Sequence, residues 1–155
     1  MKIGVDFHGV ITQNPIFFKS FNQLALEQNI EIVILSGAKA SDVIQFLKKH
    51  HIPYTSVWSI LDEFERKNLV SFDDSGKFRV PDELWDKAKA QYCLEHNISV
   101  HIDDSALYGS YFQTPFCLYL PENQKCTLIK KNIQIDFAQK PQKILNDLIA
   151  AINLK

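Results

Sequence analysis

Short apolar runs that end in polar residues alternate along this chain with segments of helical periodicity. The predicted strands are residues 2–6, 30–35, 54–58, 98–102 and 116–120. The predicted helices begin at Asn14-Pro15 and at Asp82, and further helical patterns cover residues 43–50, 62–67 and 144–152. Strands that alternate with crossover helices form a parallel sheet with right-handed connections. The sequence therefore predicts an α/β fold of Rossmann type, a three-layer arrangement with a central parallel sheet.

The length and composition indicate one globular domain over residues 1–155. Apolar residues make up 46% of the chain and charged residues 23%, which is ordinary for a soluble protein. The net charge of −1 predicts no nucleic-acid partner and no membrane partner, and the apolar runs are too short to span a bilayer. A strand that starts at Lys2 leaves no room for a signal peptide, so we expect a cytoplasmic protein.

Three cysteines, Cys93, Cys117 and Cys126, are odd in number and widely spaced. This pattern argues against a disulfide framework and against a CxxC metal site. We therefore expect reduced thiols, as is usual in a reducing cytoplasm.

Residues 59–81 interrupt the alternation of strands and helices. A charged helical piece, 62–67, is followed by two short alternating runs, 69–72 and 77–80. The sequence Asp73-Asp74-Ser75-Gly76 between these runs is typical of a hairpin turn. Because the segment is too short to fold alone, we interpret it as a small insertion of one helix and one hairpin.

Polar side chains follow three of the predicted strands. Asp6 ends the first strand, Ser36-Gly37 follows the second, and Asp103-Asp104 follows a later one. The carboxyl ends of parallel strands meet at one edge of a sheet, so we expect these residues in one pocket. Carboxylates suit Mg²⁺, whereas a hydroxyl and free backbone N–H groups before a helix suit an anion. With a lysine from the preceding helix, Lys89 or Lys87, these are the groups needed for phosphoryl transfer through an aspartyl-phosphate.

Four segments resemble the motifs of the haloacid dehalogenase (HAD) superfamily. The run from Asp6 to Thr12 is similar to the first motif, usually written DxDGTLT or DxDGVLT. Residues 32–37 resemble the second motif, and Asp103-Asp104-Ser105 resembles the fourth. Lys89 resembles the third-motif lysine of the nucleotidase-like branch. The resemblance extends from residue 2 to about residue 120 and implies a HAD-like fold with a minimal cap.

The resemblance also implies a role for each of these residues. The metal ligands would be Asp6, the backbone carbonyl of His8, Asp103 and Asp104, the last of these through a water or as a supporting partner. The catalytic residues would be Asp6 as nucleophile, His8, Ser36 and Lys89, and the phosphate would bind to Ser36, Gly37 and Lys89. Lys87 and Lys89 point to different faces of a helix, and the spacing to the aspartate pair favours Lys89.

His8 departs from the pattern of the family. Active phosphatases of the family normally carry a second aspartate here, which protonates the leaving oxygen and then activates water. Histidine can perform acid–base chemistry near neutral pH, but its reach differs from that of a carboxylate and its protonated form is disfavoured near Mg²⁺. Three interpretations stay open: a replacement acid–base, a slow enzyme that hydrolyses its aspartyl-phosphate poorly, or a binding protein with a vestigial site.

The expected function is Mg²⁺-dependent hydrolysis of a phosphomonoester. Its phosphorylated substrate can be a small molecule or larger, because members of the family without a cap tend to accept large substrates. One alternative is a catalytically weak or inactive HAD-like protein that binds a metal or a phospho-ligand. A second is a receiver-type signalling domain, although receivers place their acidic pair after the first strand. The sequence predicts neither the substrate nor the oligomeric state.

Several other prominent side chains have a structural interpretation. The helix that begins at Asp82 is expected to bury Leu84, Trp85, Ala88 and Tyr92. The aromatic side chains of Tyr108, Tyr111, Phe112 and Phe116 are typical of a core rather than of a substrate platform. His101, in the strand before the aspartates, is expected to be a packing or supporting group.

Overall fold

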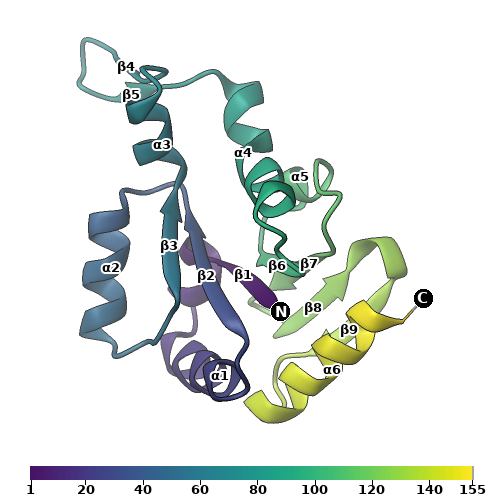
Figure 1. Ribbon diagram of the computed structural model, residues 1–155. Helices are drawn as coiled ribbons and strands as arrows, with labels where there is room; N and C mark the ends of the chain where they lie inside the picture. Colours follow the sequence, from purple (N-terminus) through teal and green to yellow (C-terminus); the bar gives the residue numbers. More distant parts are fainter. Residues whose placement is uncertain (155) are drawn as a thin grey trace.

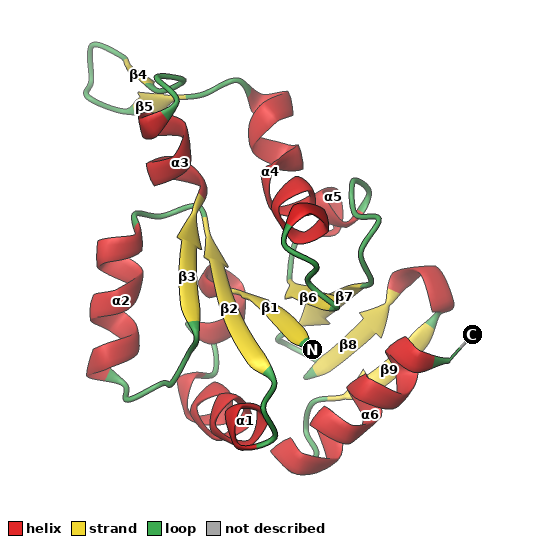
Figure 2. Cartoon of the chain, viewed as in Figure 1, coloured by secondary structure: helices red, strands yellow, loops and turns green. Residues whose placement is uncertain are grey.

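The computed structural model describes residues 1–154 and contains a seven-stranded central sheet (Figures 1 and 2). The parallel strands are β1 (Lys2–Asp6), β2 (Glu31–Ser36), β3 (Ser56–Ser59), β6 (Val100–Asp103) and β7 (Phe116–Leu120). Two further strands, β8 (Lys125–Leu128) and β9 (Ile133–Asp136), extend the sheet in antiparallel pairing. This mostly parallel sheet flanked by helices confirms the predicted α/β, Rossmann-like class.

The order of the strands places a topological switch point at the centre of the sheet. The order is β3-β2-β1-β6-β7-β8-β9. Counted over the parallel strands alone, this is the Rossmann order 3-2-1-4-5, whereas flavodoxin-like receivers have the order 2-1-3-4-5. The chain runs outward from β1 to β3 and returns to the other side of β1 to form β6. Open α/β sheets bind their ligands at such a point, beyond the carboxyl ends of the strands.

Helices cover both faces of the sheet (Figure 1). On one face, α1 (Pro15–Glu27), α2 (Ala40–Lys49) and α6 (Pro141–Asn153) pack against Ile3, Val5, Ile32 and Ile34. On the other face lie α4 (Asp82–Glu95) and the short α5 (Ala106–Gly109), where Val33 and Leu35 pack with Cys93 and Phe116. Alternate side chains of β2 therefore reach the two layers, as expected of a buried strand. No helix within residues 1–154 is both long and apolar enough to cross a membrane.

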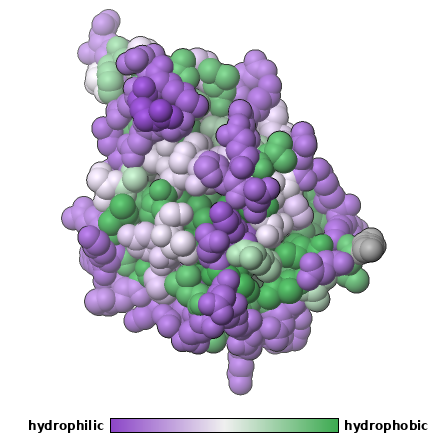
Figure 3. Space-filling model, in the orientation of Figure 1, coloured by the Kyte–Doolittle hydropathy of each residue, from purple (hydrophilic) through white to green (hydrophobic). Residues whose placement is uncertain are grey.

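The segment between β3 and α4 consists of one helix and one hairpin. The helix α3 (Ile60–Arg66) is capped by Ser59, whose hydroxyl accepts a hydrogen bond from the Asp62 N–H at 3.0 Å. The strands β4 (Ser71–Phe72) and β5 (Phe78–Arg79) form an antiparallel pair. The hairpin projects from the upper end of the molecule in Figure 1, and Figure 3 shows mostly hydrophilic side chains there.

Two parts of the structure differ from the sequence-based expectation. The strands β8 and β9, with the 3₁₀ turn Ile129–Lys131 between them, form an antiparallel edge that was not predicted. Each of these strands has only four residues, so its alternation is too short to distinguish a strand from a loop. Leu84, expected to be buried, is 46% exposed, because the first turn of α4 extends past the end of the sheet (Figure 1).

Cys117 on β7 and Cys126 on β8 form a disulfide, with their Cα atoms 5.6 Å apart. The expectation of reduced thiols is therefore wrong for this pair, and Cys93 is the free cysteine. Cys117 lies opposite Leu128 and Cys126 opposite Tyr119, so the cysteines are diagonal neighbours on one face of the sheet. Disulfides are rare in reducing compartments, so this bridge does not support the argument for a cytoplasmic location, which stays a prediction.

Candidate functional site

Asp6 and Asp103 are the last residues of β1 and β6, the two strands at the switch point. Because these strands are parallel and Val5 lies opposite Ile102, the carboxylates emerge side by side at the same edge. Both residues are buried, with exposed fractions of 5% for Asp6 and 0% for Asp103. Strand pairing thus joins two acids that are distant in the sequence.

Lys89 supplies the cation between these carboxylates. Its Nζ lies 2.6 Å from Asp6 Oδ1 and 2.7 Å from Asp103 Oδ2, and the whole residue is buried. Lys87, the alternative lysine, lies on the solvent side of α4 and pairs with Glu83 one turn earlier. Two residues correspond to about 200° of rotation around a helix, so only one of the two lysines can reach the sheet edge.

Asp104 completes an acidic cluster with Asp6 and Asp103. One carboxylate oxygen from each residue lies within 4.8 Å of the others. Asp103 is held in place by the His101 ring, with Nε2 3.1 Å from Oδ2, and by the Ser105 backbone N–H, which donates to Oδ1 at 2.9 Å. Three carboxylates against one ammonium leave negative charge at the site. These oxygens fit a hard divalent cation, and the set suits Mg²⁺, Ca²⁺ and Mn²⁺ alike.

The pKa values of the two buried acids of this cluster are shifted in opposite directions, up for Asp6 and down for Asp103. Burial, together with the charges of Asp103 and Asp104, raises the pKa of Asp6 to about 7, although Lys89 opposes the rise. Burial also acts to raise the pKa of Asp103, but hydrogen bonds and charge from His101 and Lys89 prevail and hold it below its usual range. Asp6 is therefore the buried acid that gains a proton first, and a bound cation would favour its ionised form.

The turn Phe7–Ile11 brings His8 and Gly9 to the mouth of the cluster. Gly9 has a φ of +78°, which is strained for other residues, and a Cβ at this position would collide with Asp104 Oδ2. The Gly9 N–H donates to Thr12 Oγ1 at 3.1 Å and so helps to close the turn. His8 is exposed, and its ring touches that of Phe7 edge-on, with 4.7 Å between the centroids.

A cavity of about 340 Å³ lies over the cluster and is called here the acidic cavity. Five of the predicted site residues line it, namely Asp6, His8, Gly37, Lys89 and Asp104, and Gly9 of the turn lines it as well. Ser36 does not, because it is fully buried and its hydroxyl accepts a hydrogen bond from the Ala38 N–H at 3.0 Å. The structure thus turns the Ser36 hydroxyl toward its own turn, and Gly37 faces the cavity instead.

Trp85 and Tyr108 also line the acidic cavity, although the sequence placed both in the core. Trp85 Nε1 donates to the Tyr108 hydroxyl at 3.3 Å, and Lys89 Nζ lies 5.3 Å from the centre of the Tyr108 ring. A cation near an aromatic face is stabilised. Trp85 precedes Lys89 by four residues, so the spacing on α4 already places them on one face. Tyr108 carries no such signal, because its place depends on how α5 packs.

Comparison of the chain with models of protein families, with curated proteins and with solved structures finds no match. Membership of the HAD superfamily therefore stays a prediction. What the described residues provide is a buried carboxylate pair bridged by a lysine, with a third carboxylate beside it, at the ligand-binding edge of an α/β sheet.

Proposed function

We propose that this protein is a Mg²⁺-dependent phosphomonoester hydrolase that acts through an aspartyl-phosphate on Asp6. The observation that carries the proposal is the buried contact of Lys89 with both Asp6 and Asp103, with Asp104 in the same cluster. A structural ion pair needs one carboxylate for each ammonium. An excess of buried carboxylates destabilises a fold unless a cation binds there, so the arrangement is typical of a functional site.

In the proposed reaction, a carboxylate oxygen of Asp6 attacks phosphorus, and the bond between phosphorus and the leaving oxygen breaks. The products of this step are an acyl phosphate on Asp6 and an alcohol, whose oxygen receives a proton from His8. Water then attacks phosphorus and gives a proton to His8, which releases inorganic phosphate and free Asp6. Lys89 and the Gly37 backbone hold the phosphoryl oxygens. A bound Mg²⁺ would offset the repulsion between the carboxylate and the phosphate.

His8 is the residue on which turnover depends most. It lines the acidic cavity, but it is exposed and makes no side-chain hydrogen bond within residues 1–154. An acid–base whose ring is not held transfers protons less efficiently than a positioned one. This observation favours the second candidate, a protein that binds metal and a phospho-ligand with little or no turnover. The Rossmann strand order disfavours the third, a receiver-type domain.

The test is phosphate release from simple phosphate esters with Mg²⁺ and with EDTA. We expect activity that requires Mg²⁺ and that falls to background in Asp6→Asn. Asp147→Asn, a matched change on the exposed side of α6, controls for general effects of losing a carboxylate. Activity that survives Asp6→Asn unchanged would refute the assignment of the nucleophile.

His8→Asp separates the two candidates. If the histidine limits turnover, the aspartate should raise the rate, since a general acid–base contributes roughly 10²- to 10⁴-fold. A further loss of rate would instead identify His8 as a working acid–base. If the wild type and His8→Asp both bind Mg²⁺ but neither releases phosphate, the second candidate, a binding protein, is favoured.

A further inference from the structure

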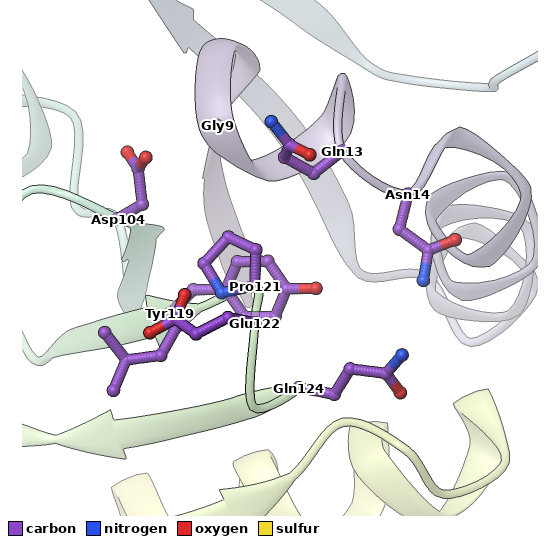
Figure 4. Close-up of a pocket in the computed structure, with 9 residues that line it drawn as sticks. Gly9, Gln13, Asn14, Asp104, Tyr119, Pro121, Glu122 and Gln124 are labelled. Carbon is purple, nitrogen blue, oxygen red and sulfur yellow. The ribbon is translucent and has the colours of Figure 1, made fainter.

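A second pocket, of about 550 Å³, lies beside the acidic cavity and is called here the polar pocket. It lies between the turn after β1, the start of α1 and the turn between β7 and β8 (Figure 4). Gly9 and Asp104 line both this pocket and the acidic cavity, so the two spaces adjoin at these residues. The volume is typical of a site for a small organic ligand.

A tyrosine hydroxyl with no protein partner points into the polar pocket. Tyr119 is only 2% exposed, and its ring packs against Phe18 and Phe137. Figure 4 shows its hydroxyl directed into the space between Asn14 and Gln124. Within residues 1–154 no hydrogen bond satisfies this hydroxyl. This hydroxyl is not one of the fully enclosed, unpartnered atoms of residues 1–154, so it reaches the open space of the pocket and can hydrogen-bond a molecule there.

The other polar side chains of the pocket are also available to a ligand. Within residues 1–154 the side-chain amides of Gln13 and Gln124 make no hydrogen bond. Asn14 uses its Oδ1 to cap α1, accepting from the Phe17 N–H at 3.2 Å, which leaves its NH₂ group free. These amides and the Tyr119 hydroxyl offer both donors and acceptors, which is what a ligand with several hydroxyl groups requires.

The charges around the polar pocket are negative only. Asp104 and Glu122 line it, and no lysine, arginine or histidine of the described chain does so. A carboxylate or a second phosphate in this pocket would meet like charge without a compensating cation, which disfavours such ligands. An uncharged ligand avoids this penalty.

We infer that the polar pocket binds the leaving group of the substrate, and that this group is an uncharged polyhydroxylated carbon chain, as in a polyol or sugar monophosphate. The inference rests on the proposed function, because the acidic cavity would hold the phosphate. Gly9 directly follows His8, so the pocket begins next to the residue proposed to protonate the leaving oxygen.

The test uses two phosphate esters that differ at one carbon. Sorbitol 6-phosphate and 6-phosphogluconate share their phosphate and inner hydroxyl groups, but the first ends in an alcohol and the second in a carboxylate. We expect kcat/KM to be about tenfold or more higher for sorbitol 6-phosphate. Glu122→Lys should shift this ratio toward 6-phosphogluconate by a similar factor. An unchanged ratio in Glu122→Lys would overturn the inference.

Tyr119→Phe removes the unpartnered hydroxyl and keeps the buried ring. It should lower kcat/KM for sorbitol 6-phosphate relative to methyl phosphate by about three- to tenfold, the effect of one neutral hydrogen bond. Tyr111→Phe removes a tyrosine hydroxyl elsewhere on the surface and should leave the ratio as in the wild type. Equal ratios in the two variants would contradict a role for Tyr119.

Binding distinguishes failure of this inference from failure of the proposed function. Hydrolysis of both esters without preference would overturn the inference and leave the hydrolase standing. If neither ester is hydrolysed, their binding to the wild-type protein is followed by the NMR shifts of the Gly9 and Gln124 amides with Mg²⁺ present. Preferential binding of sorbitol 6-phosphate would then support the polar pocket as a site for uncharged polyhydroxylated groups and would refute the proposed hydrolase activity. Absence of binding would overturn both.

Discussion

Asp6→Asn is expected to stabilise the metal-free protein at neutral and alkaline pH while it removes the proposed nucleophile. The variant keeps the shape of the side chain and removes a carboxylate whose pKa is raised from 3.8 to about 7. The pKa of Asp6 is higher in the folded chain than in the unfolded chain. At a pH between the two pKa values, Asp6 therefore keeps its proton in the folded chain and has released it in the unfolded chain. The stability that Asp6 contributes is thus fully present below the unfolded pKa, and it is lost as the pH rises through the folded pKa.

The magnitude follows from the difference between the two pKa values. A difference of about three pH units corresponds to about 4 kcal/mol, since each unit is worth 1.36 kcal/mol. Of this total, about 3 kcal/mol is lost between about pH 5 and about pH 8. For a chain of 155 residues this corresponds to a difference of roughly 6 to 12 °C in Tm.

The assay is thermal or urea unfolding of wild-type protein and Asp6→Asn in EDTA, followed by circular dichroism across this pH range. The stability of the variant relative to the wild type should grow with pH. Mg²⁺ should reduce the difference, because a cation at the cluster favours the ionised form of Asp6. A difference that is independent of pH, or a variant that becomes relatively less stable as the pH rises, would refute the account of Asp6 as a destabilised buried acid.

Three further perturbations test other parts of the site. Lys89→Met should destabilise the metal-free protein by about 3 to 5 kcal/mol in urea unfolding, because two buried carboxylates lose their cation, and Lys87→Met should leave the midpoint unchanged. Gly9→Ala and Gly76→Ala both place a side chain at a φ of 78°, and this backbone strain alone should cost each variant about 1 to 2 kcal/mol. Gly9→Ala should destabilise the protein beyond this amount and also weaken Mg²⁺ binding measured by calorimetry, because its Cβ would collide with Asp104. Gly76→Ala should do neither, since the space around Gly76 is open. Thiol titration of the unfolded, unreduced protein should count one thiol, that of Cys93, and three thiols would exclude the disulfide.

The central elements could be predicted because their signals are local. Residues 2–6 and 116–120 are apolar runs with clear ends, and both match the observed strands. The Asn14-Pro15 pair marks the start of α1 through a cap and a pre-set backbone angle, and the structure has both features. The grouping of Asp6 with Asp103 follows from a general property of parallel sheets and needs no knowledge of their packing.

The remaining features depend on pairing and packing between segments that are distant in the sequence. The β7–β8 register decides that Cys117 meets Cys126 and that the turn around Glu122 closes the polar pocket. The four-residue strand β8 is too short to reveal that register in the sequence, so the pocket had no signature there. The role of the Ser36 hydroxyl could not be predicted for a related reason. A hydroxyl at the start of a turn can accept a hydrogen bond from a backbone N–H of that turn, here that of Ala38, as readily as it can bind a ligand.

The charges of the two cavities constrain how a phosphate ester would approach the site. Among residues 1–154, Lys89 is the only lysine or arginine that lines either space, and it already contacts Asp6 and Asp103. The remaining carboxylates repel an anion, so Lys89 by itself cannot attract a phosphate to this edge of the sheet. A divalent cation at the cluster would neutralise that excess and free part of the ammonium for the phosphoryl oxygens. We therefore expect metal binding to precede phosphate binding. A leaving group that brought a further negative charge would weaken the effect of the metal, which is a second reason for an uncharged ligand in the polar pocket.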